Sequence, residues 1–319
     1  MGNWATRKVL NLLANTAGVP PNVISMRKAL AFRRHGYKTI QLHLHSWESQ
    51  DVANLPSNSP EALCERAIAK GIDYVVITDH DNDKAWRSLK NPPSNLIRGV
   101  ELSVEDPYVK DLVHLGIVNI PDDDASDHLH SLAREGDIVK LVYAARRYGA
   151  LVIRNHPEIR MGKHKLDSSA YWTIAANLNL VEEINDKRSL LENAVVYQRS
   201  LDHGLPMIAA SDSHTRMLDG CITVVRGETP GEICANIQEG KDVYMVARSA
   251  TLFNHPFMAA QYIVDGIRAQ KYEGSQPIEL GTGTFIDTAI RCLSDGRFSD
   301  RPIMRGCAQI AGGALGMTL

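Results

Sequence analysis

Eight histidine, aspartate and glutamate side chains in the first two-thirds of the chain have the types that bind divalent metal ions. They are His43, His45, His80, Glu101, His114, His156, Asp212 and His214. Neutral imidazoles and carboxylates suit Zn, Mn or Fe, and none of the five cysteines forms the C-x-x-C pair of a thiolate site. Because Glu101 is the only glutamate in the set, it is the natural bridge between two ions. Two ions about 4 Å apart can activate a water and hold the oxygens of a phosphoryl group.

These residues lie at or near the carboxyl ends of predicted strands. Short apolar runs predict seven strands, near residues 39–44, 73–78, 96–102, 112–118, 150–155, 178–184 and 206–210. His43 and His45 end the first strand, where side chains two residues apart point to the same face and can reach one ion. Glu101 is expected at the end of the third strand, and His114 within or at the end of the fourth. Each motif alone is a weak signal, but six of them at strand ends together indicate a metal centre.

Helical patterns alternate with the predicted strands. Ser59 and Gly71 have the residue types of the N-cap and C-cap of one helix, and two more helices are expected over about 137–148 and 189–203. The three aspartates at 122–124 are interpreted as a solvated turn. Alternating strands and helices indicate an α/β protein built as a β/α barrel. In such barrels the active site lies at the carboxyl ends of the strands, where the candidate ligands are.

The composition is that of an ordinary globular protein. The chain has 319 residues, of which 44% are hydrophobic and 23% charged, and its formal net charge is −2. This balance does not indicate a general nucleic-acid binder. No apolar run reaches the roughly 18 residues that a membrane span requires. The scattered cysteines fit a reducing compartment, so a cytoplasmic location is expected.

Two flanking segments differ from the middle of the chain. Residues 1–37 are basic and contain no Asp or Glu, and they are expected to form a helical extension packed on the main domain. A targeting peptide or a helix lying on anionic lipid would have a similar composition. Residues 38–247 hold all the candidate ligands and form the predicted hydrolase barrel. Residues 248–319 are expected to form a C-terminal helical segment, with helical stretches near 256–270 and 284–293.

Six motifs resemble those of the polymerase and histidinol phosphatase (PHP) family, in the family's order. They are H-L-H-S at 43–46, I-T-D-H-D at 77–81, G-V-E at 99–101, H-L-G at 114–116, N-H-P at 155–157 and S-D-S-H at 211–214. The resemblance spans about residues 39–247, and 220–244 is similar to the family's ending, where a strand and a helix precede a G-K turn. It implies a distorted (β/α)7 barrel, here with N-terminal and C-terminal helical extensions, and two or three divalent ions (Zn, Mn or Fe).

The resemblance also assigns the ligands to ions. His43, His45, Glu101 and Asp212 would hold the first ion, Glu101, His114 and His156 the second, and Asp51, His80 and His214 the third. The family pattern often has Asp five residues past the second histidine, where this chain has Gln50, and Asp51 follows. Since an ionised carboxylate binds a divalent cation more tightly than an amide does, Asp51 is the expected ligand. Catalytic roles are expected for His43, His45, Glu101, Asp212 and His214.

The expected function is that of a metal-dependent phosphoric ester hydrolase. It would hydrolyse a small phosphorylated substrate, a phosphomonoester, through a metal-activated water. Arg160 and Lys163 closely follow His156 and could bind the substrate phosphate, because basic side chains suit that role. The alternative for these two residues is a solvated basic loop.

Three other functions stay open. A nucleotide phosphatase or 5′–3′ exonuclease acting on short nucleic acid could use the same centre, although the 41 residues between His114 and His156 leave little room for an inserted domain. A C–N amidohydrolase also uses H-x-H in a barrel, but it usually needs a metal-bridging lysine, and no lysine follows a predicted strand in a suitable place. A non-catalytic module could use the metals structurally.

Overall fold

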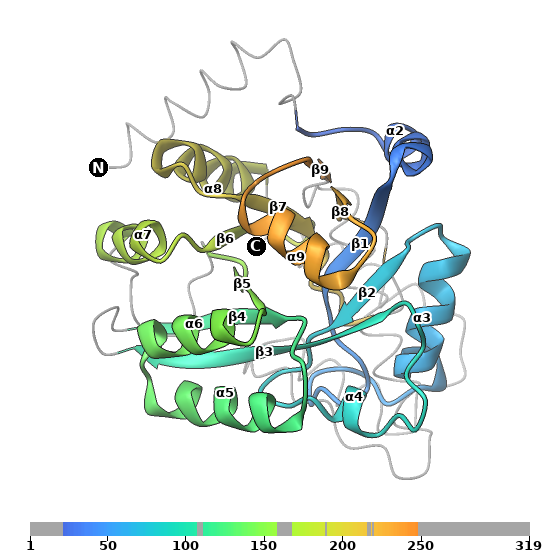
Figure 1. Ribbon diagram of the computed structural model, residues 1–319, viewed down its shortest axis with the longest axis horizontal. Coiled ribbons are helices and arrows are strands. Elements are labelled where there is room, and N and C mark those ends of the chain that lie inside the picture. The colour runs from blue at the N-terminus through green and yellow to red at the C-terminus, as the bar shows by residue number, and fades with distance from the viewer. Residues whose placement is uncertain are drawn as a thin grey trace, which may run out of the picture.

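All seven predicted strands are present, within a sheet of nine strands (Figure 1). A computed structural model describes this fold for residues 22–106, 111–157, 168–188, 190–215, 218 and 220–247. The strands are β1 (Tyr37–Leu44), β2 (Tyr74–Ile77), β3 (Leu96–Asp106), β4 (Asp111–Val118), β5 (Leu151–Arg154), β6 (Val181–Asn185), β7 (Met207–Ala210), β8 (Ile222–Arg226) and β9 (Val243–Val246). Their order in the sheet is β7-β6-β5-β4-β3-β2-β1-β8-β9.

The strand β7 lies against β1 and closes the sheet into a distorted barrel. Ser213, just after β7, pairs with Leu44 at the end of β1, and the His45 N–H donates to the Ser213 carbonyl over 2.8 Å. Farther along the same seam, the Gln41 amide donates to Ser211 Oγ over 2.8 Å. The α/β barrel that the sequence predicts is therefore confirmed, as a nearly closed sheet surrounded by helices (Figure 1).

Two strands run against the direction that a regular β/α barrel requires. β4 is antiparallel to both β3 and β5, and β8 is antiparallel to β1. β4 pairs along its whole length with residues 99–106 of β3, and β3 continues to Asp106, beyond its predicted end at residue 102. Glu101 thus lies inside β3 and not at its end, which corrects the expectation from the sequence. Because β4 is reversed, His114 lies in its first half, beside Glu101.

The end of the barrel away from the ligands is filled by apolar side chains and covered by α9 (Pro230–Gln238). Buried residues from each of β1 to β8 pack in one cluster with Ile233 and Ile237 of this helix. Fully burying an isoleucine contributes about 1.5–3 kcal/mol, so α9 stabilises the closed barrel. The strand and helix that the sequence predicts within 220–244 are β8 and α9.

Helices cover the outer face of the barrel (Figure 1). They are α3 (Pro60–Ala69), α4 (Lys84–Arg87), α5 (Asp123–Glu135), α6 (Ile138–Arg147), α7 (Ser168–Asn177) and α8 (Leu190–His203). The three helices predicted from the sequence correspond to α3, α6 and α8. As predicted, the Ser59 side chain caps α3 by accepting from the Ala62 N–H over 3.2 Å.

The aspartates at 122–124 begin helix α5, so their interpretation as a solvated turn is wrong. Asp122 is the N-cap, and its side chain accepts from the Ala125 N–H over 2.8 Å. Asp123 and Asp124 lie in the first turn, where negative charge interacts favourably with the helix dipole. The apolar side of α5, including Leu129, is buried against the β3–β4 hairpin.

A buried ion pair joins neighbouring strands beneath α7. Arg154 on β5 lies 2.5 Å from Glu182 on β6, and both side chains are fully buried. The Arg154 guanidinium stacks over Trp172 of α7, with 4.0 Å between Cζ and the ring centroid. This pair ties α7 to the sheet two residues before His156.

We expect Arg154→Met to lower the free energy of unfolding by about 3–5 kcal/mol, because Glu182 would lose the cation that compensates its burial. Urea unfolding of the purified protein measures this change. Arg147→Met, at an exposed position on α6, is the control and should be close to neutral. Equal stabilities of the two variants would show that the ion pair contributes little to the fold.

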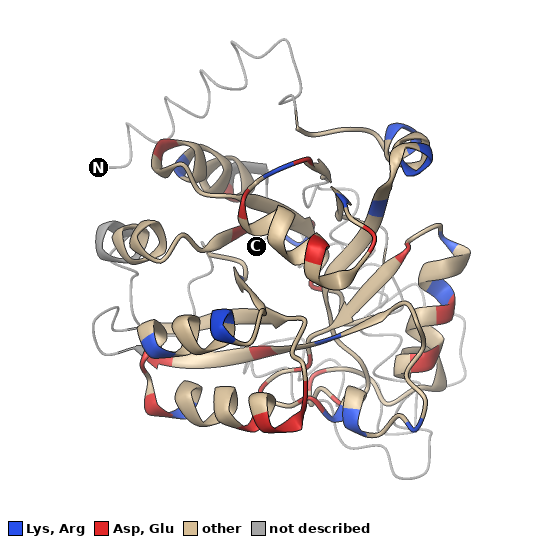
Figure 2. Cartoon of the chain, in the orientation of Figure 1, with Lys and Arg blue, Asp and Glu red and all other residues tan. Residues whose placement is uncertain are grey.

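The segment before β1 packs on the barrel through α2 (Met26–Phe32) and a 3-10 helix (Arg33–His35). The Phe32 ring contacts those of Tyr37 and Tyr244, with centroids 5.1 and 5.0 Å away. Helix α2 carries Lys and Arg but no acidic residue (Figure 2). Residues 1–21 and the predicted helical stretches near 256–270 and 284–293 lie outside the described residues, so the proposed division into three segments stays a prediction.

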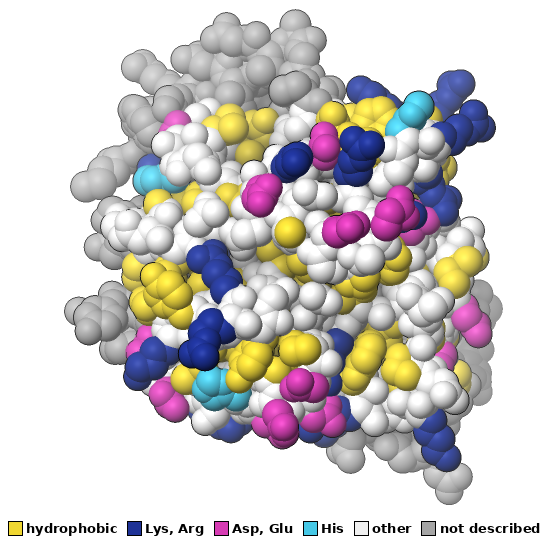
Figure 3. All heavy atoms as spheres, viewed as in Figure 1, with side chains coloured by type: hydrophobic (Ala, Val, Ile, Leu, Met, Phe, Trp, Pro, Cys, Tyr) yellow, Lys and Arg dark blue, Asp and Glu magenta, His cyan; other side chains and the backbone are white. Residues whose placement is uncertain are grey.

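The described surface has no extended apolar face in the view of Figure 3. Hydrophobic side chains there form small patches separated by charged and polar groups (Figure 3). Within the described ranges, no helix has the length and apolar character needed to cross a membrane.

Candidate metal centre

The side chains of His43 and His45 lie close together because the register of β1 against β2 shifts near the end of β1. The pairing of β1 with β2 shifts register within the last four residues of β1, and such an irregularity re-aims side chains. Leu42 packs in the apolar interior of the barrel, whereas the two imidazoles project into the site. Their Nε2 atoms are 3.1 Å apart, and each lies within 3.5 Å of carboxylate oxygens of Glu101 and Asp212.

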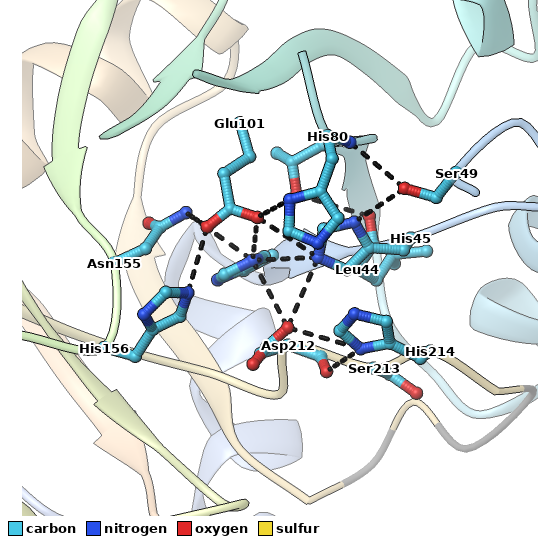
Figure 4. A network of polar contacts seen from close by, with 12 residues as sticks. Leu44, His45, Ser49, His80, Glu101, Asn155, His156, Asp212, Ser213 and His214 are labelled. Atoms are coloured by element: carbon cyan, nitrogen blue, oxygen red, sulfur yellow. Dashed lines mark hydrogen bonds and ion pairs between the residues drawn. The ribbon is translucent and has the colours of Figure 1, made fainter. Parts of the chain in front are cut away.

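Glu101 is at the centre of the cluster (Figure 4). Its carboxylate faces five imidazoles at 2.9–3.4 Å, those of His43, His45, His80, His114 and His156. Oε2 is directed at the first three rings and Oε1 at the last two. The Glu101 side chain is fully buried. One carboxylate with its two oxygens directed at two groups of imidazoles is in the position that the sequence predicts for a bridging ligand.

Asp51 joins His80 to His214 on another side of the cluster. Its Oδ2 atom lies 3.3 Å from His80 Nε2 and 2.8 Å from His214 Nε2. His214 also places Nδ1 3.4 Å from Asp212 Oδ1. Gln50 is exposed. Asp51 therefore faces the cluster and Gln50 faces solvent.

Two candidate ligands that follow strands have strained backbone. His156, after β5, has φ +33°, and Asp212, after β7, has φ +46°. The left-handed region costs a residue with a Cβ atom roughly 1–2 kcal/mol. These conformations turn the chain sharply at the strand ends, where both side chains point into the site (Figure 4). Such strain persists where the surrounding structure holds a residue in a functional position.

Glu183, which the sequence analysis missed, holds the outer nitrogen of His43. His43 Nδ1 lies 2.7 Å from Glu183 Oε2, and the Asn185 amide donates to the other Glu183 oxygen over 2.7 Å. A carboxylate behind a metal-binding histidine fixes the ring and leaves the other nitrogen for the ion. The available signal was V-E-E-I-N within a predicted strand, since buried glutamates are rare unless they are paired.

Two further polar side chains support the ligands from outside the eight-residue set. The Asn155 amide donates to Glu101 Oε1 over 2.9 Å. Ser49 Oγ lies 3.3 Å from His45 Nδ1 and accepts the His80 N–H over 3.1 Å (Figure 4). The loop after β1 and the residue before His156 thus orient the ligands as well as connect them.

The ionisable groups of the cluster shift one another's pKa. Burial opposes the ionisation of Glu101, yet the imidazoles of His43 and His114 hold its pKa well below the usual range. Burial and the neighbouring His214 lower the pKa of His45 to about 3. His45 is therefore neutral at physiological pH, and neutral imidazole is the form that binds metal ions.

The donor set fits divalent cations. Four groups of three side chains place ligand atoms within 4.8 Å of one another: His45, His80 and His214; His43, His45 and Asp212; His43, Glu101 and His156; and His80, Glu101 and His114. Glu101 Oε2 and His114 Nδ1 are buried and face other candidate ligand atoms, with Oε2 2.9 Å from His80 Nδ1 and His114 Nδ1 3.2 Å from Glu101 Oε1. A cation would satisfy such atoms. His114 and His156, which the family resemblance assigns to one ion, fall in two different groups that share Glu101.

We expect Asp51→Asn to lower both metal content and turnover, and Gln50→Ala to change neither. The loss in turnover should be on the order of 100-fold, because the carboxylate that faces His80 and His214 would become a neutral amide. Metal analysis and rates on purified variants measure both quantities. Wild-type metal content and rate in Asp51→Asn would show that this loop binds no ion.

All nine candidate ligands lie in the described part of the chain and come together in one cluster. The two predicted phosphate-binding residues, Arg160 and Lys163, lie outside the described residues. Their role stays a prediction.

Comparison with known proteins yields structural neighbours but no sequence relatives. No family model and no curated protein matches the sequence. PsfC from Pseudomonas syringae PB-5123 has a similar structure, with 15% identity, a TM-score of 0.50, and coverage of 74% of this chain and 98% of PsfC. At that identity, the likeness shows the fold alone.

Two other neighbours have lower TM-scores. A two-domain protein from Bacteroides vulgatus, which contains a predicted PHP-like metal-dependent phosphoesterase, is 17% identical with a TM-score of 0.45, over 67% of this chain and 66% of its own. An amidohydrolase from Chromobacterium violaceum with bound sulfate is 16% identical with a TM-score of 0.39, over 55% and 87%. The structural neighbours of the chain include a protein with a PHP-like domain.

Proposed function

We propose that the protein is a metal-dependent phosphoesterase that hydrolyses a phosphomonoester at the cluster around Glu101. The observation that carries this proposal is the fully buried carboxylate of Glu101, which faces five imidazoles within 3.4 Å. Two or three ions of Zn, Mn or Fe suit nitrogen and oxygen ligands that include no thiolate. Bound there, divalent ions would lower the pKa of a water molecule and offset the charge of the phosphoryl oxygens.

The side chains of the chain prepare this chemistry by holding the ligand atoms in place. Glu183 contacts Nδ1 of His43, so Nε2 of the same ring faces the interior of the cluster. Asp212 lies between the His43–His45 pair and His214, within 3.5 Å of each of the three rings. We further propose that the basic residues Arg160 and Lys163, which follow His156 in the sequence, bind the phosphate.

The position of Glu101 favours ester hydrolysis over the amidohydrolase alternative. That alternative usually needs a lysine between two metal ions. One lysine, Lys187, does follow a strand near the cluster, which the sequence analysis did not recognise. Its Nζ atom lies 2.7 Å from His214 Nδ1, while Glu101 occupies the position between the groups of imidazoles.

A panel of substrates tests the proposed function. Metal-loaded wild type and Asp212→Asn are assayed with p-nitrophenyl phosphate, its diester, a nucleoside 5′-monophosphate, a short single-stranded oligonucleotide and a p-nitroanilide. We expect the monoesters to react fastest, with a loss of about 10²-fold or more in Asp212→Asn, since this residue contacts three ligand imidazoles.

The other outcomes separate the alternatives. Preferred cleavage of the oligonucleotide would support the nuclease hypothesis. Cleavage of the anilide alone would support the amidohydrolase hypothesis. Absence of turnover on every substrate by fully loaded protein would contradict the proposal.

A further inference from the structure

Two basic residues follow β6 beside the ligand cluster. Lys187 and Arg188 lie in the turn that begins at Asn185. Asn185 Oδ1 accepts the Lys187 N–H over 2.8 Å, and the Asn193 amide of α8 donates to the Asn185 carbonyl over 2.7 Å. The turn is therefore fixed through its backbone and two asparagine side chains. The ammonium of Lys187 and the guanidinium of Arg188 take no part in these hydrogen bonds.

The Lys187 ammonium lies against the ligands themselves. Its Nζ atom is 2.7 Å from His214 Nδ1, while Nε2 of the same ring faces Asp51 at 2.8 Å. Although burial opposes it, Lys187 and the nearby imidazoles hold the pKa of Asp212 well below its usual range. Figure 4 shows His214 beside Asp212 at the edge of the network, on the side away from Glu101. Lys187 therefore places a positive charge beside His214 at this edge of the cluster.

The Arg188 guanidinium is partly buried near the same carboxylates. Burial lowers its pKa, and the negative charges of Asp212, Glu192 and Glu183 oppose that effect. Its Nε atom is buried and makes no hydrogen bond within the described ranges. Buried side-chain donors are normally paired, and a guanidinium can bind a phosphate through two parallel hydrogen bonds. An anion is the partner that these donors fit.

The charge balance of the loaded site points to the same kind of partner. Asp51, Glu101, Glu183 and Asp212 carry four negative charges, which two divalent ions would cancel. Glu192, whose negative charge also acts on Arg188, offsets one of the two positive charges of Lys187 and Arg188, so one positive charge would stay uncompensated with two ions and three with three ions. A phosphomonoester carries a charge of roughly −1.5 to −2 at neutral pH and balances two positive charges, whereas a diester carries only one negative charge.

We propose that Lys187 and Arg188 bind the phosphate of the substrate and make the site selective for phosphomonoester dianions over diesters. This inference deepens the proposed function and rests on the presence of the metal ions. The two residues contact the phosphate from the β6 side of the cluster.

Binding of inorganic phosphate to metal-loaded protein tests the inference without turnover. Calorimetry gives the Kd for wild type, Lys187→Gln and Arg188→Gln, with the metal content of each measured in parallel. We expect each substitution to raise the Kd for phosphate by about 10- to 100-fold, because one charge-assisted hydrogen bond to phosphate is lost. Each variant should keep its metal. The ratio of monoester to diester kcat/KM should fall in the same variants. Lys241→Gln and Arg147→Gln, at exposed positions, are matched controls.

The outcomes separate this inference from the proposed function. Unchanged phosphate affinity in both variants, with metal retained, would overturn the inference even when ester hydrolysis is present. Phosphate binding that depends on the two residues, in a protein that hydrolyses no ester, would support the inference and overturn the proposed function. In wild type, phosphate should also protect Arg188, but not Arg147, from phenylglyoxal. Equal labelling of Arg188 with and without phosphate would count against the inference regardless of how the variants fold.

Discussion

Removing divalent ions with a chelator is expected to abolish ester hydrolysis, and adding back Zn, Mn or Fe is expected to restore it. The nine candidate ligands supply only imidazole and carboxylate groups, and none of them can replace the ions as a Lewis acid. Since a divalent ion lowers the pKa of water from about 15.7 to about 7, the loss should be at least on the order of 10³-fold. Rates on a phosphomonoester before chelation, after chelation and after reloading measure the effect.

The fold should survive chelation, which makes the experiment interpretable. The interior cluster capped by α9 and the outer helices lie away from the ligands and hold the barrel. Circular dichroism of the stripped protein is the control. Full activity in folded protein shown to contain no metal would contradict the metal-dependent mechanism.

Glu101→Gln is expected to cause the largest loss of any single substitution. The change replaces the negative charge at the centre of five imidazoles by a neutral amide, which can donate hydrogen bonds but cannot bridge two cations. The charge stabilisation that a bound ion supplies amounts to several kcal/mol, so kcat/KM should fall on the order of 10³-fold or more. Metal content should fall together with the rate.

The matched control is Glu239→Gln, the same chemical change at an exposed position after α9. It should leave both metal content and kcat/KM unchanged. If Glu101→Gln kept its metal and its rate, Glu101 would be a buried structural carboxylate, and the ions would be held by other residues.

The candidate ligands could be recognised in the sequence because each one belongs to a short local motif next to a predicted strand. His43 and His45 are two residues apart, and S-D-S-H places Asp212 and His214 together after an apolar run. The seven strands could be predicted for the same reason, since buried strands are continuous apolar runs. These features depend on residues close together in the sequence.

The direction of β4 could not be predicted in this way. Strand pairing is decided by contacts between distant residues, and the apolar pattern of β4 is the same in either direction. The sequence therefore indicated regular β/α alternation, with Glu101 at a strand end. In the structure, the antiparallel hairpin of β3 and β4 brings Glu101 and His114 together from the interiors of two strands.

Residues that act on the ligands from neighbouring strands were also missed. Glu183, Lys187 and Arg188 all lie on or just after β6, a strand that supplies none of the nine ligands. Their importance follows from where β6 lies in the barrel, beside β7 and the ligands that follow it. No local motif marks Lys187 or Arg188, and the signal for Glu183 was the V-E-E-I-N run in a predicted strand.

The most direct test of the metal-dependent centre is a stepwise titration of metal into stripped wild-type protein. Bound metal and phosphomonoesterase rate are measured in the same samples. We predict that the rate rises with bound metal and levels off when two or three equivalents per chain are bound, and that a His43→Ala, His45→Ala double variant binds fewer equivalents and stays inactive. A rate that is independent of bound metal, or a double variant that binds and hydrolyses like wild type, would contradict the assignment of this cluster as the catalytic metal centre.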